Sequence, residues 1–170
     1  MTEIRLEKPE DASRVRHINE TAFGQPAEAN LVDRLRQAYA DSLSLVAEDD
    51  AVVGHILFTP VVVERAGRQV LGMGLAPMAV LPDFQRRGIG SQLVRRGLDI
   101  LRERNCPFVV VVGHPEYYPR FGFEPASAHG LVSQWEGIPD AAFMVLVLAP
   151  HTMAGVSGVA MYRDEFNEGT

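Results

Sequence analysis

The sequence predicts a mixed α/β fold in which antiparallel strands are followed by one parallel crossover. Three β-rich runs separated by short turns come first, as expected of antiparallel neighbours: Leu43–Ala47, Val52–Val63 and Val70–Val80. A helix is then expected over Ser91–Arg104, and the apolar run Phe108–Val112 follows it as a strand buried on both faces. Because a strand, a helix and a second strand form a right-handed parallel unit, the third and fourth of these strands are expected to run parallel.

The N-terminal part is expected to add one short strand and two helices. Ile4–Leu6 alternates apolar with charged side chains, and a helix opens at Pro9 and continues through Ala22. A second helix, about Glu28–Ala38, has one apolar and one charged face. The acidic residues Glu48–Asp50 are expected to form a hairpin turn, and Phe143–Leu148 is the last strand that the pattern indicates.

Length and charge restrict the classes of protein that the chain can belong to. With 170 residues, 46% hydrophobic and 22% charged, the sequence fits one globular domain over residues 1–170. The formal net charge of −6 argues against nucleic-acid binding and against anionic membranes, because both require an extended positive surface. No apolar run approaches the ~20 residues of a membrane span, the first residues are too charged for a signal peptide, and Cys106 cannot form an internal disulfide. These features predict a cytoplasmic protein.

The most informative segment is a glycine-rich turn between the third predicted strand and the helix. It spans Gln85–Gly90, where Arg86 and Arg87 are followed by two glycines that flank one apolar residue. Glycine lets the main chain turn tightly and approach a ligand without a Cβ in the way. The N–H groups of the starting helix, its dipole and the two arginines converge there and favour phosphate oxygens. We therefore expect this turn to bind a pyrophosphate group.

The flanks of this turn make its pattern more specific. Val80 and Pro82 mark the end of a strand, the turn follows at Gln85–Gly90, and after a helix and a buried strand come Tyr118 and then Phe121–Phe123. This arrangement resembles the GNAT superfamily of acetyl-CoA-dependent N-acetyltransferases, whose signature is Gln/Arg-x-x-Gly-x-Gly/Ala after a strand and a Tyr ahead of Gly-Phe downstream. Within it, the chain is most similar to the subgroup of bacterial predicted N-acetyltransferases, whose substrates are mostly unassigned.

The resemblance implies both a fold and a place for the acyl donor. It implies a GNAT-like, mostly antiparallel central sheet with helices on both faces, in which the parallel strands ending at Val80 and Val112 splay apart around acetyl-CoA. Main-chain groups of the first strand would bind the pantetheine arm as an added strand, and an N–H near Ala79 or Val80 would stabilise an oxyanion. The cofactor-binding residues that it implies are Met78, Ala79, Val80, Gln85, Arg86, Arg87, Gly88, Ile89, Gly90 and Ser91.

The resemblance also implies a tyrosine that protonates the departing thiolate. Tyr118 matches this position, and Tyr117 directly before it competes for the role. A phenol with a reference pKa of ~10 is neutral at pH 7 and can donate a proton. The attacking amine must lose a proton, but the strand Val70–Val80 lacks the acidic residue that relatives often keep. The candidates for a base near this edge of the sheet, none of them assigned, are Asp83, His114 and Glu116.

The predicted function is the transfer of an acetyl group from acetyl-CoA to a primary amine of a small molecule or peptide, by direct attack of the amine on the thioester. Two alternatives stay open. One is a non-catalytic acyl-CoA-binding or regulatory module, motivated by the missing acidic residue, and the other is transfer to a hydroxyl or of a longer acyl group. The histidines show no metal-ligand spacing, so no metal is implied. Homodimers are common in the family, and the sequence leaves the oligomeric state open.

Overall fold

The computed structural model describes residues 1–65 and 67–167, which form two compact units. Unit 1 comprises Met1–Thr59, Ala76–Asp99 and the chain from Asp164 onward, and unit 2 comprises Pro60–Leu75 and Ile100–Arg163. Strands β3 (Ala51–Arg65) and β4 (Arg68–Val80) and helix α3 (Ile89–Glu103) contribute residues to both units. The expectation of one domain over residues 1–170 stays a prediction.

The strands of unit 1 follow the order β1, β2, β3, β4. β1 (Glu3–Leu6) pairs antiparallel with β2 (Leu43–Asp49), and β2 pairs antiparallel with β3. The hairpin turn between β2 and β3 is shorter than the predicted Glu48–Asp50, because the strands extend toward each other and Asp50 alone connects them, with a φ of 63°. Aspartate tolerates this left-handed conformation since its short polar side chain bonds locally.

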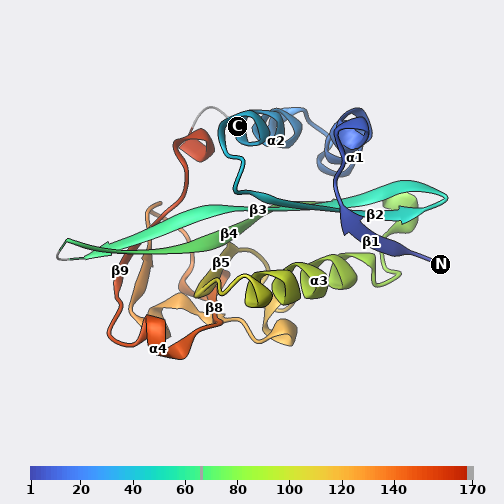
Figure 1. Ribbon diagram of the computed structural model, residues 1–170. Helices are drawn as coiled ribbons and strands as arrows, with labels where there is room; N and C mark the ends of the chain where they lie inside the picture. Colours follow the sequence, from blue (N-terminus) through green and yellow to red (C-terminus); the bar gives the residue numbers. More distant parts are fainter. Residues whose placement is uncertain (66, 168–170) are drawn as a thin grey trace. The chain divides into compact units, whose positions relative to one another are not determined.

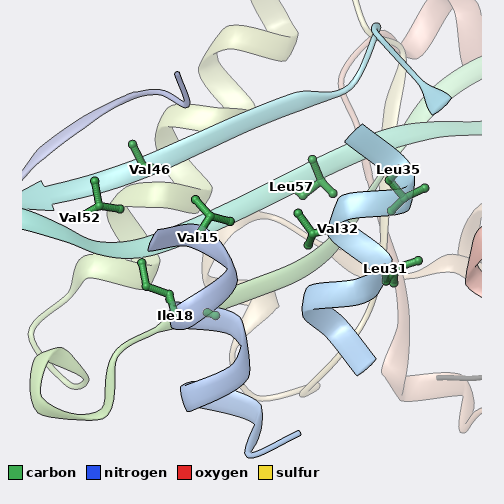
Figure 2. Packing of buried hydrophobic residues seen from close by; sticks show 9 residues of the cluster. Val15, Ile18, Leu31, Val32, Leu35, Val46, Val52 and Leu57 are labelled. Carbon is green, nitrogen blue, oxygen red and sulfur yellow. The ribbon is translucent and has the colours of Figure 1, made fainter. Parts of the chain in front are cut away.

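Helices cover both faces of the unit 1 strands, as the family resemblance implied. In Figure 1, α1 (Ala12–Phe23) and α2 (Ala27–Ala38) lie on one face and the first turns of α3 lie on the other. On the α3 face, Gly54 leaves room for helix side chains, because a Cβ there would come within 3.2 Å of both Ile89 and Leu93. On the opposite face, Figure 2 shows side chains of α1, α2, β2 and β3 meeting in one hydrophobic cluster, in which the labelled residues are Val15, Ile18, Leu31, Val32, Leu35, Val46, Val52 and Leu57.

Unit 2 contains the parallel pair that the sequence predicted. β4 and β5 (Phe108–Val112) run parallel and are paired, for example, at Gly74 and Val110. On its other side β5 pairs antiparallel over its whole length with β8 (Phe143–Val147). The expectation that β5 is buried throughout is wrong at its last residue, because Val112 is 40% exposed.

The C-terminal third contains strands that the sequence pattern does not indicate. β7 (Leu131–Ser133) and β9 (Gly158–Met161) pair parallel, and β9 also pairs antiparallel with β3. The strand expected at Phe143–Leu148 is present as β8, but β9 follows it as a later strand that the pattern does not indicate. β9 has four residues and starts with glycine, which is too short for a periodicity to be recognised.

The remaining elements are short, and none of the described helices is long and apolar enough to cross a membrane. They are β6 (Glu124–Pro125), α4 (Pro150–Met153) and the 3₁₀ turns η1 (Pro9–Asp11), η2 (Pro82–Phe84), η3 (Tyr118–Phe121), η4 (Ala126–His129), η5 (Asp140–Ala142) and η6 (Asp164–Asn167).

Candidate functional site

The glycine-rich turn of unit 1 is fixed to the end of β4 by local hydrogen bonds. The N–H of Leu81 donates to the Val53 carbonyl of β3 at 2.9 Å, and the Phe84 N–H donates to the Leu81 carbonyl at 2.8 Å. The side-chain amide of Gln85 reaches back and donates to the Val80 carbonyl at 2.9 Å. Gln85 therefore closes the loop on the last residue of the strand, so that the segment after it leaves β4 in a defined direction.

Helix α3 starts inside the glycine-rich turn. The N–H of Gln92 donates to the Gly88 carbonyl at 3.0 Å. The N–H groups that precede it include that of Gly88, directly before α3, and those of Ile89 and Gly90 in the first turn of the helix. The sequence placed the helix start at Ser91, two residues too late. Ile89 is only 3% exposed and packs against the strand at Gly54, and this burial outweighs the low helix propensity of Gly90.

Gly88 gives the turn its shape and its openness. Its φ is +80°, a conformation that side chains other than glycine rarely adopt, and a Cβ built on it would meet no atom within 4 Å. The residue is exposed and stands at the positive end of α3. An anion can therefore approach the main chain here without a steric barrier from the protein.

The two arginines of the turn are held in different ways. Arg86 is exposed and has a φ of 64°, which costs a non-glycine residue on the order of 1 kcal/mol. The guanidinium of Arg87 lies 5.1 Å from the centroid of the Phe84 ring, a cation–π contact that holds its charge beside the turn. The turn thus combines main-chain donors with two permanent positive charges.

The last residues of β4 face alternate sides of the strand. Ala79 is 4% exposed and belongs to the hydrophobic cluster beneath α1 and α2. Met78 and Val80 are half-buried and point to the opposite side, as successive strand residues do. The three residues predicted to bind the acyl donor therefore divide between core packing and the opposite face of the strand.

The predicted tyrosine of unit 2 is held in an aromatic cluster. Tyr118 lies at the start of η3, is 8% exposed, and makes edge-to-face contacts with Tyr117 and Phe123 at centroid distances of 5.1 and 5.7 Å. Gly113, directly after β5, lies against the same ring: a Cβ there would stand 2.4 Å from a ring carbon of Tyr118. The ring of Tyr118 is therefore fixed by packing from several segments.

Burial distinguishes Tyr118 from Tyr117 chemically. Removal from water disfavours the phenolate and, with a smaller contribution from neighbouring Tyr117, raises the pKa of Tyr118 to about 12. Tyr117 is half-buried, and its ring is covered by the guanidinium of Arg120 at 4.5 Å, which also donates from Nε to the Tyr117 carbonyl. Burial therefore keeps the Tyr118 phenol protonated at neutral pH.

The other candidate residues lie either at the exposed surface or in a fully hydrogen-bonded core position. Asp83, His114 and Glu116 are exposed, and the His114 carbonyl accepts from the N–H of Tyr117 at 3.0 Å. His55 is fully buried, with ring nitrogens 3.2 Å from the Asn19 amide and 2.9 Å from the Ser44 hydroxyl, as expected of a structural histidine. The described residues contain no group of three or more His, Cys, Asp or Glu side chains that could hold a metal ion.

Sequence reasoning missed two residues that shape these regions. Phe84 supplies the ring beneath Arg87, and Gly113 supplies the space for Tyr118. An aromatic residue three positions before an arginine and a glycine directly after a buried strand were visible signals, but both occur in many proteins without such contacts. Only the tertiary structure identifies their partners.

The fold and these motifs agree with the comparison with known proteins. The model of the acetyltransferase (GNAT) domain family matches residues 3–126, and the chain belongs to this family. The chain is 40% identical over 166 residues to the uncharacterized N-acetyltransferase YhbS of Escherichia coli K12, covering 96% of this chain and 98% of that protein. It is also 42% identical over 120 residues to the uncharacterized N-acetyltransferase YjhQ of the same organism, covering 69% of this chain and 66% of that protein.

Two similar proteins have been crystallised with CoA or acetyl-CoA. The structure of E. coli YhbS in complex with CoA shares 39% sequence identity and a TM-score of 0.91, over 99% of this chain and 93% of that one. A GNAT family acetyltransferase from Brucella melitensis in complex with acetyl-CoA shares 36% identity and a TM-score of 0.80, over 98% of both chains. The chain is therefore an acyltransferase of the GNAT family, and the fold class is confirmed.

Proposed function

We propose that this enzyme transfers the acetyl group of acetyl-CoA to a primary amine of a small molecule or peptide, by direct attack of the amine on the thioester. The observation that carries the proposal is the open, exposed turn at Gly88, where main-chain N–H groups meet the positive end of α3. We also infer a cytoplasmic location, because the single Cys106 cannot form an internal disulfide.

The residues around the turn fit the diphosphate of the donor. The N–H groups from Gly88 to Ser91 would receive the phosphate oxygens, and Arg86 and Arg87 would add charge that is present at every physiological pH. Main-chain groups of Met78–Val80 would bind the pantetheine arm by strand addition. Gln85 has a supporting role in this proposal, because its amide already bonds to the Val80 carbonyl.

The proposed chemistry needs one proton donor and one proton acceptor. As the amine nitrogen bonds to the acetyl carbon, the carbon–sulfur bond breaks and the leaving sulfur takes a proton from the Tyr118 phenol. The amine nitrogen gives its own proton to solvent water, and solvent returns one proton to the phenolate, so that the products are the amide and the free thiol. Burial keeps this phenol protonated, but a pKa of about 12 also makes it a weaker acid than an exposed tyrosine. A thiolate in apolar surroundings has a raised pKa as well, so the proton transfer stays feasible when both groups are shielded from water.

The proposal is tested on the full chain by following thiol release from acetyl-CoA with a panel of acceptors. The panel contains alkyl amines, aryl amines, amino acids and short peptides, with alcohols of matched shape as controls. Turnover with at least one amine and none with its matching alcohol supports the proposal. Faster reaction with an alcohol or with hexanoyl-CoA would instead indicate the O-acyl or longer-acyl alternative. Calorimetric binding of CoA without turnover for any acceptor would contradict the proposal and favour a binding module.

A further inference from the structure

Unit 1 contains a cavity that the acetyl-transfer proposal does not use. It has a volume of about 300 Å³ and lies between the C-terminal end of α2, the segment after β1 and the start of β2. Leu57 of β3 lines it and is four residues along the strand from Val53, which holds the exit of β4. At roughly 3.4 Å per residue, about 14 Å of strand lies between Leu57 and Val53. We call it the Lys8 cavity, after the lysine at its rim.

The carboxylate in the wall of the Lys8 cavity is already satisfied. Glu7 has a side chain that is only 6% exposed, and its two oxygens accept from the Ser44 hydroxyl and, at 2.5 Å, from the guanidinium of Arg36. Behind Ser44 lies His55, whose Nδ1 faces the donating amide of Asn19. This arrangement assigns the proton to His55 Nε2, which donates to Ser44 and leaves the Ser44 proton for Glu7. Glu7 therefore has little capacity left for a cationic ligand.

The groups without partners at the Lys8 cavity are donors. The Oγ atom of Ser42 is buried and, among the residues that the structure describes, has no hydrogen-bond partner. Among residues 1–65 and 67–167, the ammonium of Lys8 has no ion pair within 4 Å, and it acts only at longer range on the carboxylate of Asp11, which Arg5 already holds. The charged side chains of the lining are one carboxylate, Glu7, against two cations, Lys8 and Arg36. A buried hydroxyl without a partner costs free energy, which a ligand that accepts its proton would recover.

The remaining walls are apolar and set the size of a ligand. Val32, Leu57 and the ring of Tyr39 face the cavity, and the exposed Ala40 stands at its mouth. The cavity volume of about 300 Å³ is at the lower end of the volumes found for ligand sites. If each non-hydrogen atom takes the ~30 Å³ of a water molecule, the cavity holds about ten such atoms. The site thus offers one anionic subsite beside a small apolar space.

We propose that the Lys8 cavity binds a small monocarboxylate with an apolar body, such as a short fatty acid or a single-ring aromatic acid. The carboxylate faces the Lys8 ammonium and accepts a hydrogen bond from the Ser42 hydroxyl, whose buried Oγ reaches the cavity surface by rotation about the Cα–Cβ bond. The apolar body lies against Val32 and Leu57. This site is independent of the proposed acetyl transfer, because it uses no residue of the glycine-rich turn or of the tyrosine cluster.

Lys8 is the only lysine in the sequence, which makes a direct observation practical. Reductive methylation with ¹³C-formaldehyde labels two positions only, Lys8 and the N-terminal amine, and leaves both positively charged. We expect titration with hexanoate or benzoate to shift the Lys8 methyl signal along a saturating curve, while the signal of Met1 stays in place. Hexylamine and benzyl alcohol, which keep the apolar body but lack the carboxylate, should cause no saturating shift. A linear response, or equal responses to acid and amine, would overturn the proposal.

Variants then test which residues form the site, with binding measured by calorimetry and by the amide signals of α2. Lys8→Gln and Ser42→Ala should each weaken hexanoate binding at least 5-fold, and Ser42→Ala should not lower stability because it removes a hydroxyl that has no partner. Ala40→Phe should block the mouth and abolish binding. Ala38→Phe, at an exposed position of α2 outside the lining, is the matched control and should bind as the wild type does. Unchanged affinity in both Ala40→Phe and Lys8→Gln would show that the acid binds elsewhere and that the proposal is wrong.

Discussion

The glycine-rich turn of unit 1 and the tyrosine cluster of unit 2 contrast in how the chain presents functional groups. The turn is exposed, consists of consecutive residues and offers main-chain N–H groups beside two charged side chains. Tyr118 is buried, and its ring is positioned by residues of other segments, among them Gly113 and Phe123. Binding of an anion requires access and fixed dipoles, whereas control of a proton requires exclusion of water. The two regions meet these opposite requirements with opposite burial.

This contrast makes a separable prediction for each region. Changes in the turn should alter affinity for acetyl-CoA and leave the chemical step nearly intact. Changes around Tyr118 should alter turnover and leave affinity nearly intact. A variant that changes both the affinity for acetyl-CoA and the turnover would show that binding and chemistry are not separated between the two regions.

The largest effect is expected for Tyr118→Phe. Removal of a general acid typically costs 10²- to 10⁴-fold, so we expect kcat to fall roughly 100-fold or more. The dissociation constant of acetyl-CoA, measured by calorimetry, should stay within about 2-fold, because the ring and its packing are kept. Tyr117→Phe is the matched control and should retain most of the activity. Full activity of Tyr118→Phe would remove this residue from the mechanism.

A smaller but still large effect is expected for Gly113→Ala, because the new Cβ would stand 2.4 Å from the Tyr118 ring and displace it. Misplacement of a reacting group by about 1 Å can cost 10²-fold, so we expect kcat to fall roughly 10- to 100-fold with unchanged acetyl-CoA affinity. The control is a double-mutant cycle. If Gly113 acts through the tyrosine hydroxyl, Gly113→Ala should have no further effect on kcat in the Tyr118→Phe background. Additive losses would indicate a general structural defect.

In the turn, Gly88→Ala and Gly90→Ala should differ. Gly88 has a φ of +80°, so alanine there should cost about 1–2 kcal/mol of stability by thermal or chemical unfolding and raise KM for acetyl-CoA about 10-fold. Gly90 lies in the first turn of α3, where alanine favours the helix, so Gly90→Ala should not lose stability. Any rise in KM for Gly90→Ala would then report a Cβ that intrudes on the ligand. Unchanged KM in both variants would contradict the placement of the diphosphate.

The sequence predicted what is local and periodic. The helices α1, α2 and α3 and the strands β2 to β5 carry continuous patterns, and the turn and the tyrosine segment are short contiguous motifs. The prediction missed β7 and β9, because strands of three and four residues are recognised by their partners rather than by their own pattern. Their pairing depends on residues far apart in the chain.

The finer features of the site could not be predicted from the sequence, because they too depend on contacts between residues far apart in the chain or on burial in the folded protein. Three features depend on tertiary packing. They are the cation–π contact of Arg87 with Phe84, the space that Gly113 leaves for the Tyr118 ring, and the Ser42 hydroxyl of the Lys8 cavity, which has no hydrogen-bond partner among the described residues. The start of α3 at Ile89 is a further example, since a buried contact overrides the low propensity of glycine.

The smallest effect is expected in an alkaline titration, which follows one phenol among the four tyrosines and tests the burial of Tyr118 without any substrate. Burial favours the neutral phenol, so the pKa rises from its usual value near 10 to about 12. The folded state therefore holds this proton longer than the unfolded state, and the associated stability is fully present below pH 10 and lost as pH rises toward 12. In alkaline titrations at 295 nm, the wild-type curve minus the Tyr118→Phe curve should give one phenol with a midpoint near pH 12. A midpoint near pH 10 in the folded protein would mean that water reaches the hydroxyl, and the contrast between an open turn and a shielded acid would fail.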